Sequence, residues 1–220
     1  MEFEHAPDEP ANELAERGQT VLLSARTTAA SLMTLHDSGD FEEGTEVQQD
    51  LLRATLLLAT AGIDSMVKQL VHDALPVVIA SKEGARAKLE DFVDRRLRRE
   101  DQSGMKLVAA ALASNTPRAS VVDALVRELG SSSLQSVEEL SKAVAFFDIP
   151  TADVIGDMAR LADVFEARNQ IAHKMDVDFS QEAGHRIPRD RDLVVGYVNE
   201  IFGTASAILR EVDARLTPSE

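Results

Sequence analysis

Apolar side chains recur every three or four positions through most of the chain, which is the spacing of one face of an α-helix. Residues 11–35 show the pattern at Leu14, Val21, Leu22, Ala25, Leu32 and Leu35. A last stretch, residues 191–216, repeats it as far as Val212. No stretch alternates between apolar and polar residues as a half-buried strand does. The pattern therefore predicts an all-α protein.

The stretch from about Glu46 to Leu75 is apolar on more than one face. Such a helix lies at the centre of a bundle or contributes to a dimer contact. Pro76 is expected to kink or stop it. Its most apolar part, Leu51 to Ile63, contains Arg53 and is too short to span a bilayer, so we expect no membrane partner.

Breaks in the pattern divide the rest of the chain. A charged helix is expected at about 83–99, with short helices at 104–113, 118–129 and 135–146. Another helix should open at Pro150, with Thr151 or Asp153 near its cap, and residues 176–190 read as a loop. The sequence thus predicts one domain over 11–216, with four to five main helices plus short inserted helices. Residues 1–10 read as a disordered acidic tail.

Composition narrows the chemistry. Aromatic residues make up 4% of the chain and Trp is absent, so the core must consist of aliphatic residues and Met. There is no cysteine, which excludes a disulfide framework, a thiolate metal site and a Cys nucleophile. The first 20 residues are acidic and lack the apolar segment of a secretory signal, so we expect a cytoplasmic protein.

Charge is unevenly distributed along the chain. The net charge is −15, and residues 1–50 hold 12 acidic and 2 basic side chains, a net of −10. The remaining residues are therefore close to balanced, at −5. This balance argues against a protein that grips nucleic acid through bulk charge, but it leaves room for a local site.

One segment carries recognisable chemistry: Arg168-Asn169 followed by His173. In a helix, Asn169 and His173 are four residues apart and share a face, and the long Arg168 side chain can curl towards them. Imidazole can accept the proton of a ribose 2′-OH, and a guanidinium can bind phosphate oxygens. This spacing occurs by chance in many helical proteins, and on spacing alone an exposed Arg beside a partly buried His at a helix end is the more frequent case.

The residues around this segment resemble the sequence motifs of a known family. Arg-Asn-x-x-x-His is the signature of HEPN domains, and Glu166-Ala-Arg-Asn-Gln-Ile-Ala-His-Lys-Met-Asp176 is similar to the RiboL-PSP-type branch. Upstream, Ser133-Leu-Gln-Ser-Val-Glu-Glu-Leu140 resembles that branch's Ser-Phe-Gln-Ser-Pro-Glu stretch, with Val137 in place of Pro. Residues 51–64 resemble its long second helix, which ends in Asp64.

The resemblance implies a HEPN-like helical bundle that dimerises with its motifs facing a shared cleft. It implies a metal-independent endoribonuclease, acting as a toxin or in antiviral defence, that cleaves RNA by transesterification. Its catalytic residues would be Arg168, Asn169 and His173. A cognate antitoxin or a nucleotidyltransferase encoded by a neighbouring gene would be a possible partner and would support the hypothesis that the protein is a toxin. The alternative is a non-catalytic HEPN protein that binds nucleotide or docks a partner.

Several residues are weaker candidates. Asp64, Asp176 and Glu166 are candidate supporting residues; Asp176 could orient the His173 ring if the helix continues that far, and Asp64 could equally be structural. Candidate RNA-binding residues are Arg95, Arg96, Arg98, Arg99 and Lys174, although neighbouring carboxylates also fit a plain solvated face. The histidines lack short metal-ligand spacing, so we expect no metal and no cofactor.

Overall fold

The structure is a computed structural model that describes residues 2–40, 44–98, 102–178 and 185–217. Its helices are α1 (Glu13–His36), α2 (Glu46–Asp73), α3 (Leu75–Ser81), α4 (Glu83–Leu97), α5 (Ser103–Leu112), α6 (Pro117–Ser131), α7 (Val137–Ala145), α8 (Thr151–Val154), α9 (Met158–Lys174) and α10 (Arg191–Leu216). Two short strands, β1 (Val177–Asp178) and β2 (His185–Arg186), pair antiparallel. The predicted all-α class is confirmed.

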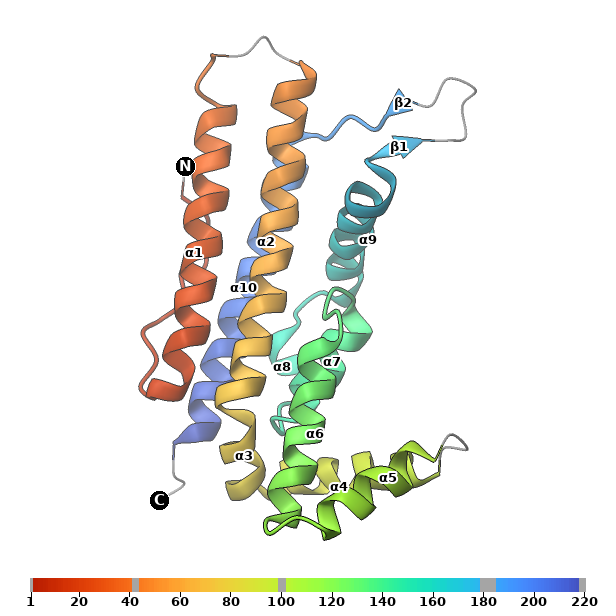
Figure 1. The fold of residues 1–220 in the computed structure, drawn as a ribbon. Coiled ribbons are helices and arrows are strands. Elements are labelled where there is room, and N and C mark those ends of the chain that lie inside the picture. Colours follow the sequence, from red (N-terminus) through yellow and green to blue (C-terminus); the bar gives the residue numbers. More distant parts are fainter. Residues whose placement is uncertain (1, 41–43, 99–101, 179–184, 218–220) are drawn as a thin grey trace.

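Three long helices, α1, α2 and α10, lie side by side along the length of the molecule, and α9 runs beside α2 and α10 (Figure 1). The shorter α4, α5 and α6 gather at the opposite end from the β1–β2 hairpin. Because α2 packs against α1, α6, α9 and α10, its apolar residues face neighbours on several sides. The expected central position of this helix is confirmed.

The apolar character of α2 has a structural explanation. By length and composition α2 is long and apolar enough to cross a membrane, but 61% of its most apolar 18 residues are buried inside the fold. The core helix of a soluble protein has the same property. Leu56, Ile63 and Leu70 are among the core residues with no exposed surface.

Helix ends follow the local chemistry of the sequence. Asn12, Thr45 and Asp190 cap α1, α2 and α10 by accepting hydrogen bonds from the backbone of the first turn. Pro76 occupies the first turn of α3, directly after α2 has ended at Asp73. A proline cannot supply the N–H that a continuing α2 would need, so the chain restarts as a separate helix.

Two expected elements differ in the structure. The helix expected from Pro150 is split into α8 and α9, because the chain is extended at Ile155 and α9 begins with Asp157 as its cap. Ile155 is buried as expected, but from the connection rather than from a helix. The expected loop 176–190 contains the β1–β2 pair, with Val177 opposite Arg186.

The N-terminal segment also differs from the expected disordered tail; residue 1 lies outside the described residues. Phe3 is 7% exposed and its ring lies edge-on to that of Phe202, with centroids 5.5 Å apart. The Arg26 guanidinium donates to the backbone carbonyls of Phe3, Glu4 and His5 at 2.8–2.9 Å. One apolar side chain and one arginine therefore hold a segment that is otherwise acidic against α1 and α10.

Candidate functional site

The candidate motif occupies the last two turns of α9. This helix forms because Asp157 caps its start and five residues face the core: Leu161, Val164, Phe165, Ala167 and Ile171. It ends at Lys174, and Met175 follows in the left-handed conformation with φ of 51°. His173 and Lys174 lie in this last turn.

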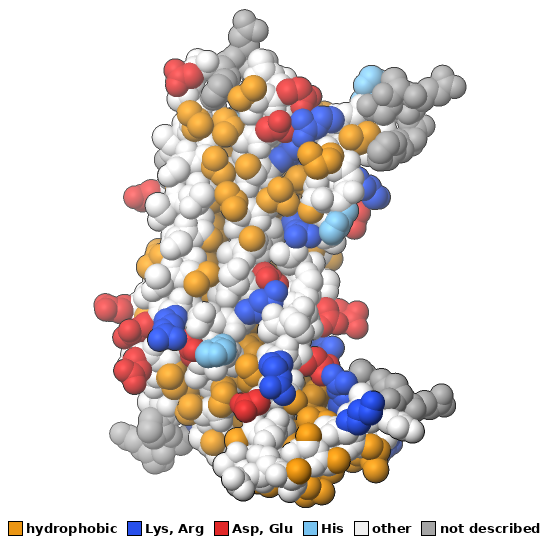
Figure 2. All heavy atoms as spheres, viewed as in Figure 1, with side chains coloured by type: hydrophobic (Ala, Val, Ile, Leu, Met, Phe, Trp, Pro, Cys, Tyr) orange, Lys and Arg blue, Asp and Glu red, His pale blue; other side chains and the backbone are white. Residues whose placement is uncertain are grey.

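The structure brings two of the three motif side chains into contact. Arg168 donates from Nη1 to Oδ1 of Asn169 at 3.0 Å, and both residues are half-buried. His173 is exposed, four residues after Asn169 and on the same helix face. Figure 2 shows Lys and Arg side chains interspersed with acidic and hydrophobic ones over this face of the molecule. The guanidinium and imidazole are therefore open to a large ligand.

Chemically, this arrangement offers a base, a cation and an amide on one open surface. An exposed imidazole can accept a proton from a ligand or donate one to it. Arg168 uses one N–H on Asn169 and has further donors for phosphate oxygens. In the described part of the chain, no hydrogen bond fixes the His173 ring, so its orientation would have to come from substrate or a partner.

Two flanking candidates, Glu166 and Lys174, are exposed on the same helix. Glu166 accepts a hydrogen bond from Gln170 Nε2 at 3.3 Å, one turn along the helix. Lys174 lies directly beside His173 in the sequence and adds positive charge at the helix end. The structure places both near the motif without bringing either into contact with Arg168 or Asn169.

Asp64 has a structural role. Its Oδ1 accepts the backbone N–H of Leu134 at 2.8 Å, and its Oδ2 accepts from Lys68 Nζ at 2.8 Å. Leu134 belongs to the Ser133–Leu140 stretch, so two of the sequence segments that carry the resemblance are in direct contact. Asp64 thus fixes the segment before α7 against α2, and is not in contact with a motif side chain.

Asp176 was expected to orient the His173 ring only if the helix continued that far. The helix α9 ends two residues earlier, so this condition is not met. Its side chain is fully buried and binds two arginines: Arg53 Nε donates to Oδ2 at 3.0 Å, and Arg189 Nε donates to the same oxygen at 2.8 Å. Arg189 Nη2 also donates to Oδ1 and, at 3.2 Å, to Gln170 within the motif. The carboxylate joins α2, the end of α9 and the segment before α10.

Further ion pairs extend this cluster to the β1–β2 hairpin. Arg186 pairs with Glu46 and with Asp50, each at 2.7 Å. The hydrogen bond from Arg186 lowers the pKa of the Asp50 carboxyl, and the same bond raises the pKa of Arg186. Arg53 and Arg189 were not singled out as site residues from the sequence. A charged Arg53 inside an apolar helix was the one available signal, since such a residue needs a buried partner.

A groove of about 570 Å³ lies between α2 and the end of α9, beside the motif. It is lined by Asp50, Arg53, Ala54, Leu57, Ile171, Ala172, Met175, Val177 and Arg186. Met175 is 66% exposed, and Leu58, next along α2, is 41% exposed. The groove next to the motif is therefore lined by apolar side chains together with the charged Asp50, Arg53 and Arg186.

The basic run lies elsewhere. Arg95, Arg96 and Arg98 belong to α4 or follow it, at the end of the molecule away from the hairpin, and Arg99 lies outside the described residues (Figure 1). Arg96 is bonded to Glu128 and lies over the Phe92 ring, and Arg98 pairs with Asp94 at 2.9 Å. The structure does not bring this run to the motif.

The other candidate histidines, His36, His72 and His185, show no arrangement typical of a metal site. Nδ1 of His36 lies 2.8 Å from Asp37, and Nδ1 of His72 lies 2.7 Å from Asp73. His185 is exposed on β2. Among the described residues, no cluster of three or more His, Asp or Glu side chains could hold a metal ion.

Comparison with known proteins gives no further identification: no family model, no curated protein and no solved structure matches the chain.

Proposed function

We propose that the protein is a metal-independent endoribonuclease of the HEPN type, with His173 as general base and Arg168 as phosphate-binding residue. The observation that carries the proposal is the Arg168–Asn169 contact on an open helix surface that also presents His173. The reaction would be attack of a ribose 2′-OH on the adjacent phosphate. His173 takes the 2′-OH proton and the bond between phosphorus and the 5′-oxygen breaks. The 5′-oxygen leaves as a hydroxyl group with a proton from solvent, and a 2′,3′-cyclic phosphate remains.

Two further features support the proposal. The contact between Asp64 and Leu134 joins two segments that, with the motif, carry the resemblance in the expected order. The apolar groove and exposed Leu58 next to the motif offer a surface on which a second copy could dock. A two-fold dimer through this surface would bring two copies of His173 to one cleft. A toxin or antiviral role would follow from the same activity.

The test is cleavage of labelled RNA by wild type and variants. His173→Ala should reduce cleavage by ~10²–10⁴-fold, since this is the usual contribution of one acid–base group. Arg168→Ala should be severe and Arg168→Lys should restore little, because an ammonium lacks the planar fork of donors. Asn169→Ala should be milder, because the amide only orients Arg168.

The matched control is His72→Ala, which removes an exposed histidine paired with Asp73 on α2. Cleavage should survive EDTA, and RNA with a 2′-deoxy residue at the cleaved position should resist. Full activity in His173→Ala, or activity abolished by EDTA, would rule out this mechanism.

The alternative is a non-catalytic HEPN-type protein that binds nucleotide or a partner. Two observations favour it: the net charge of −15, and the pairing of Arg96 and Arg98 with carboxylates, which leaves little positive surface for RNA. Absence of cleavage, together with saturable binding of a mononucleotide that Arg168→Ala abolishes, would favour this function over the nuclease.

A further inference from the structure

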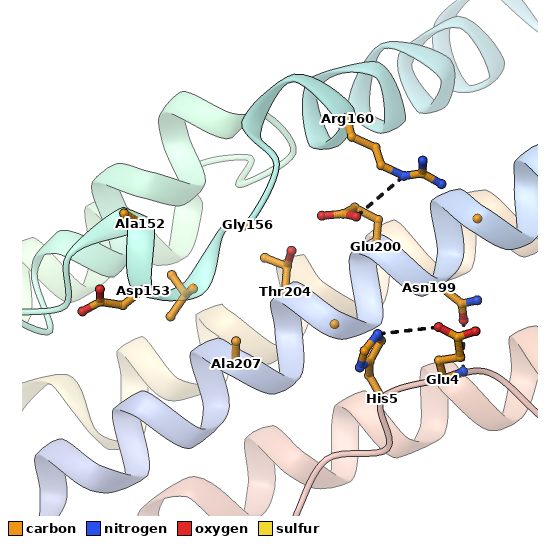
Figure 3. A pocket seen from close by; sticks show the side chains of 13 residues that line it. Glu4, His5, Ala152, Asp153, Gly156, Arg160, Asn199, Glu200, Thr204 and Ala207 are labelled. Carbon is orange, nitrogen blue, oxygen red and sulfur yellow. Dashed lines mark hydrogen bonds and ion pairs between the residues drawn. The ribbon is translucent and has the colours of Figure 1, made fainter.

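A second cavity, which shares no lining residue with the groove, lies between the N-terminal segment, the α8–α9 connection and α10. Its volume is about 480 Å³ (Figure 3). It is lined mainly by Glu4, His5, Val154, Arg160, Glu200 and Thr204 together with small residues of α10. Arg160 is in the first turn of α9, eight residues before Arg168 and so about 12 Å away along the helix axis. The cavity is distinct from the candidate nuclease site.

Two glycines of α10 set the shape of the cavity. A Cβ on Gly196 would lie 2.6 Å from Nη2 of Arg160, and one on Gly203 would lie 3.2 Å from Cδ2 of His5. The absence of these carbons lets the guanidinium and the imidazole lie directly against α10. Arg160 and His5 therefore stand at two sides of a floor made by Glu200 and Thr204.

Thr204 contributes a hydroxyl group to the wall of this cavity. Thr204 is 4% exposed, and Figure 3 shows its hydroxyl directed into the space between α10 and the α8–α9 connection. In the portion of the chain that is described, this hydroxyl has no hydrogen-bond partner. Because the hydroxyl faces the cavity, it can donate a hydrogen bond to a molecule bound there or accept one from it.

The charged side chains indicate what kind of molecule it is. Arg160 Nε lies 3.7 Å from the Glu200 carboxylate, which is an ion pair but too long for a hydrogen bond. Both groups therefore keep hydrogen-bonding capacity for a ligand. A guanidinium favours a carboxylate and a carboxylate favours an ammonium. Because Arg160 and Glu200 are adjacent, the two opposite charges of the ligand must also be adjacent.

We propose that this cavity binds a free α-amino acid, whose carboxylate and ammonium are carried by the same carbon. The carboxylate lies on Arg160, the ammonium on Glu200, and the Thr204 hydroxyl completes the hydrogen bonding. The amino-acid side chain extends over Val154 and Ala207, which also line the cavity. This binding function does not depend on the proposed nuclease activity.

The experiment is calorimetric titration of the full chain with each of the proteinogenic amino acids, with melting temperature as a second readout. At least one amino acid should bind saturably at micromolar to low millimolar concentration and raise the melting temperature. Two analogues of that amino acid test the charge assignment, the amine without the carboxylate and the acid without the ammonium. Each should bind at least about tenfold more weakly.

Variants test the residues. Thr204→Val, which keeps the shape but removes the hydroxyl, and Arg160→Gln and Glu200→Gln should each weaken binding by about tenfold or more. Gly196→Ala should do the same, because the added carbon displaces the Arg160 guanidinium. The control is Arg210→Gln, on the same helix, whose guanidinium lies 3.8 Å from Glu211 outside the cavity; its affinity should match wild type.

Three results would overturn the proposal. The first is the absence of saturable binding by every amino acid tested. The second is unchanged affinity in both Arg160→Gln and Glu200→Gln, with circular dichroism showing that the variants are folded. The third is an analogue lacking one charge that binds as tightly as the amino acid itself.

Discussion

The Asp64 carboxylate holds the segment before α7 against the middle of α2 through the backbone N–H of Leu134. Asp64→Ala leaves this buried N–H without an acceptor, which should destabilise the fold by ~1–3 kcal/mol. Asp64→Asn keeps an acceptor oxygen and should cost less. Urea unfolding of both variants checks the order. Lys68→Ala, which removes only the partly exposed partner at 2.8 Å, is the control and should change stability by less than ~1 kcal/mol.

Asp37 and Arg191 join the end of α1 to the start of α10 and should give the fold a measurable pH dependence. The Arg191 guanidinium, which donates to both oxygens of Asp37, lowers the pKa of that carboxyl well below its ordinary range. Because the folded-state pKa is depressed, the stabilisation is present above the unfolded-state pKa, about 3.9, and is lost as the pH falls below it.

Arg191→Gln should therefore lower the melting temperature at neutral pH, and the difference from wild type should shrink as the pH falls below about 4. The effect should stay under ~1 kcal/mol, since Arg191 is 40% exposed and solvent screens the pair. A series of melting curves from neutral to acid pH measures it. A difference that grows towards acid pH would contradict the assignment.

At the scale of elements, the end of the motif helix is held by the buried cluster of Asp176, Arg53 and Arg189. The exposed fractions of these three side chains are 0%, 4% and 10%. Asp176→Ala leaves two buried guanidinium groups without their shared carboxylate. Removing one partner of a buried ion pair usually destabilises a protein by ~3–5 kcal/mol.

Asp176→Ala should also raise amide hydrogen exchange selectively in the last turn of α9 and in the described residues of the hairpin, because these are the segments that the carboxylate joins. Glu46→Ala is the control, since Glu46 pairs with Arg53 and Arg186 but is 65% exposed. It should change stability by less than ~1 kcal/mol. Uniform exchange changes across α1, α2 and α9 would contradict a local role for Asp176.

The long helices were predictable because each contains its own signals. Glu46 follows the cap Thr45, Pro76 stands where α2 must end, and the bounds of α10 match the expected 191–216. The break between α8 and α9 could not be predicted from the spacing of apolar residues alone, because Val154 and Ile155 continue the apolar pattern up to the break. The hairpin was missed because its position depends on ion pairs between Arg186 and residues about 140 positions earlier in the chain.

The same distinction applies to the candidate site. Asn169 and His173 share a face because of helical spacing, which the sequence contains. Asp64 binds Leu134, 70 residues away, and Asp176 binds Arg53, 123 residues away, so local spacing could not identify these two contacts. The contact of Phe3 with the helices could not be predicted for a related reason. One aromatic residue in an acidic segment forms no periodic apolar pattern, and its partner Phe202 is near the other end of the chain.

At the scale of the whole molecule, the described surface next to the motif is apolar while the chain as a whole is strongly acidic. Along α2, Val47 and Leu58 are 54% and 41% exposed, and Met175 after α9 is 66% exposed. An exposed apolar surface beside a candidate site can serve as a protein interface. Repulsion between acidic chains opposes self-association, so a dimer would need to bury this surface.

If the proposed dimer uses this surface, wild type should scatter light as a dimer at micromolar concentration, and Leu58→Asp should be a monomer with unchanged helix content. The physical reason is that a buried carboxylate without a partner at the interface opposes association. Val77→Asp is the matched control, since Val77 is 42% exposed on α3 near the opposite end of α2. It should remain dimeric. A monomeric wild type, or a dimer that Leu58→Asp leaves intact and Val77→Asp disrupts, would show that two motifs do not meet through the α2 surface.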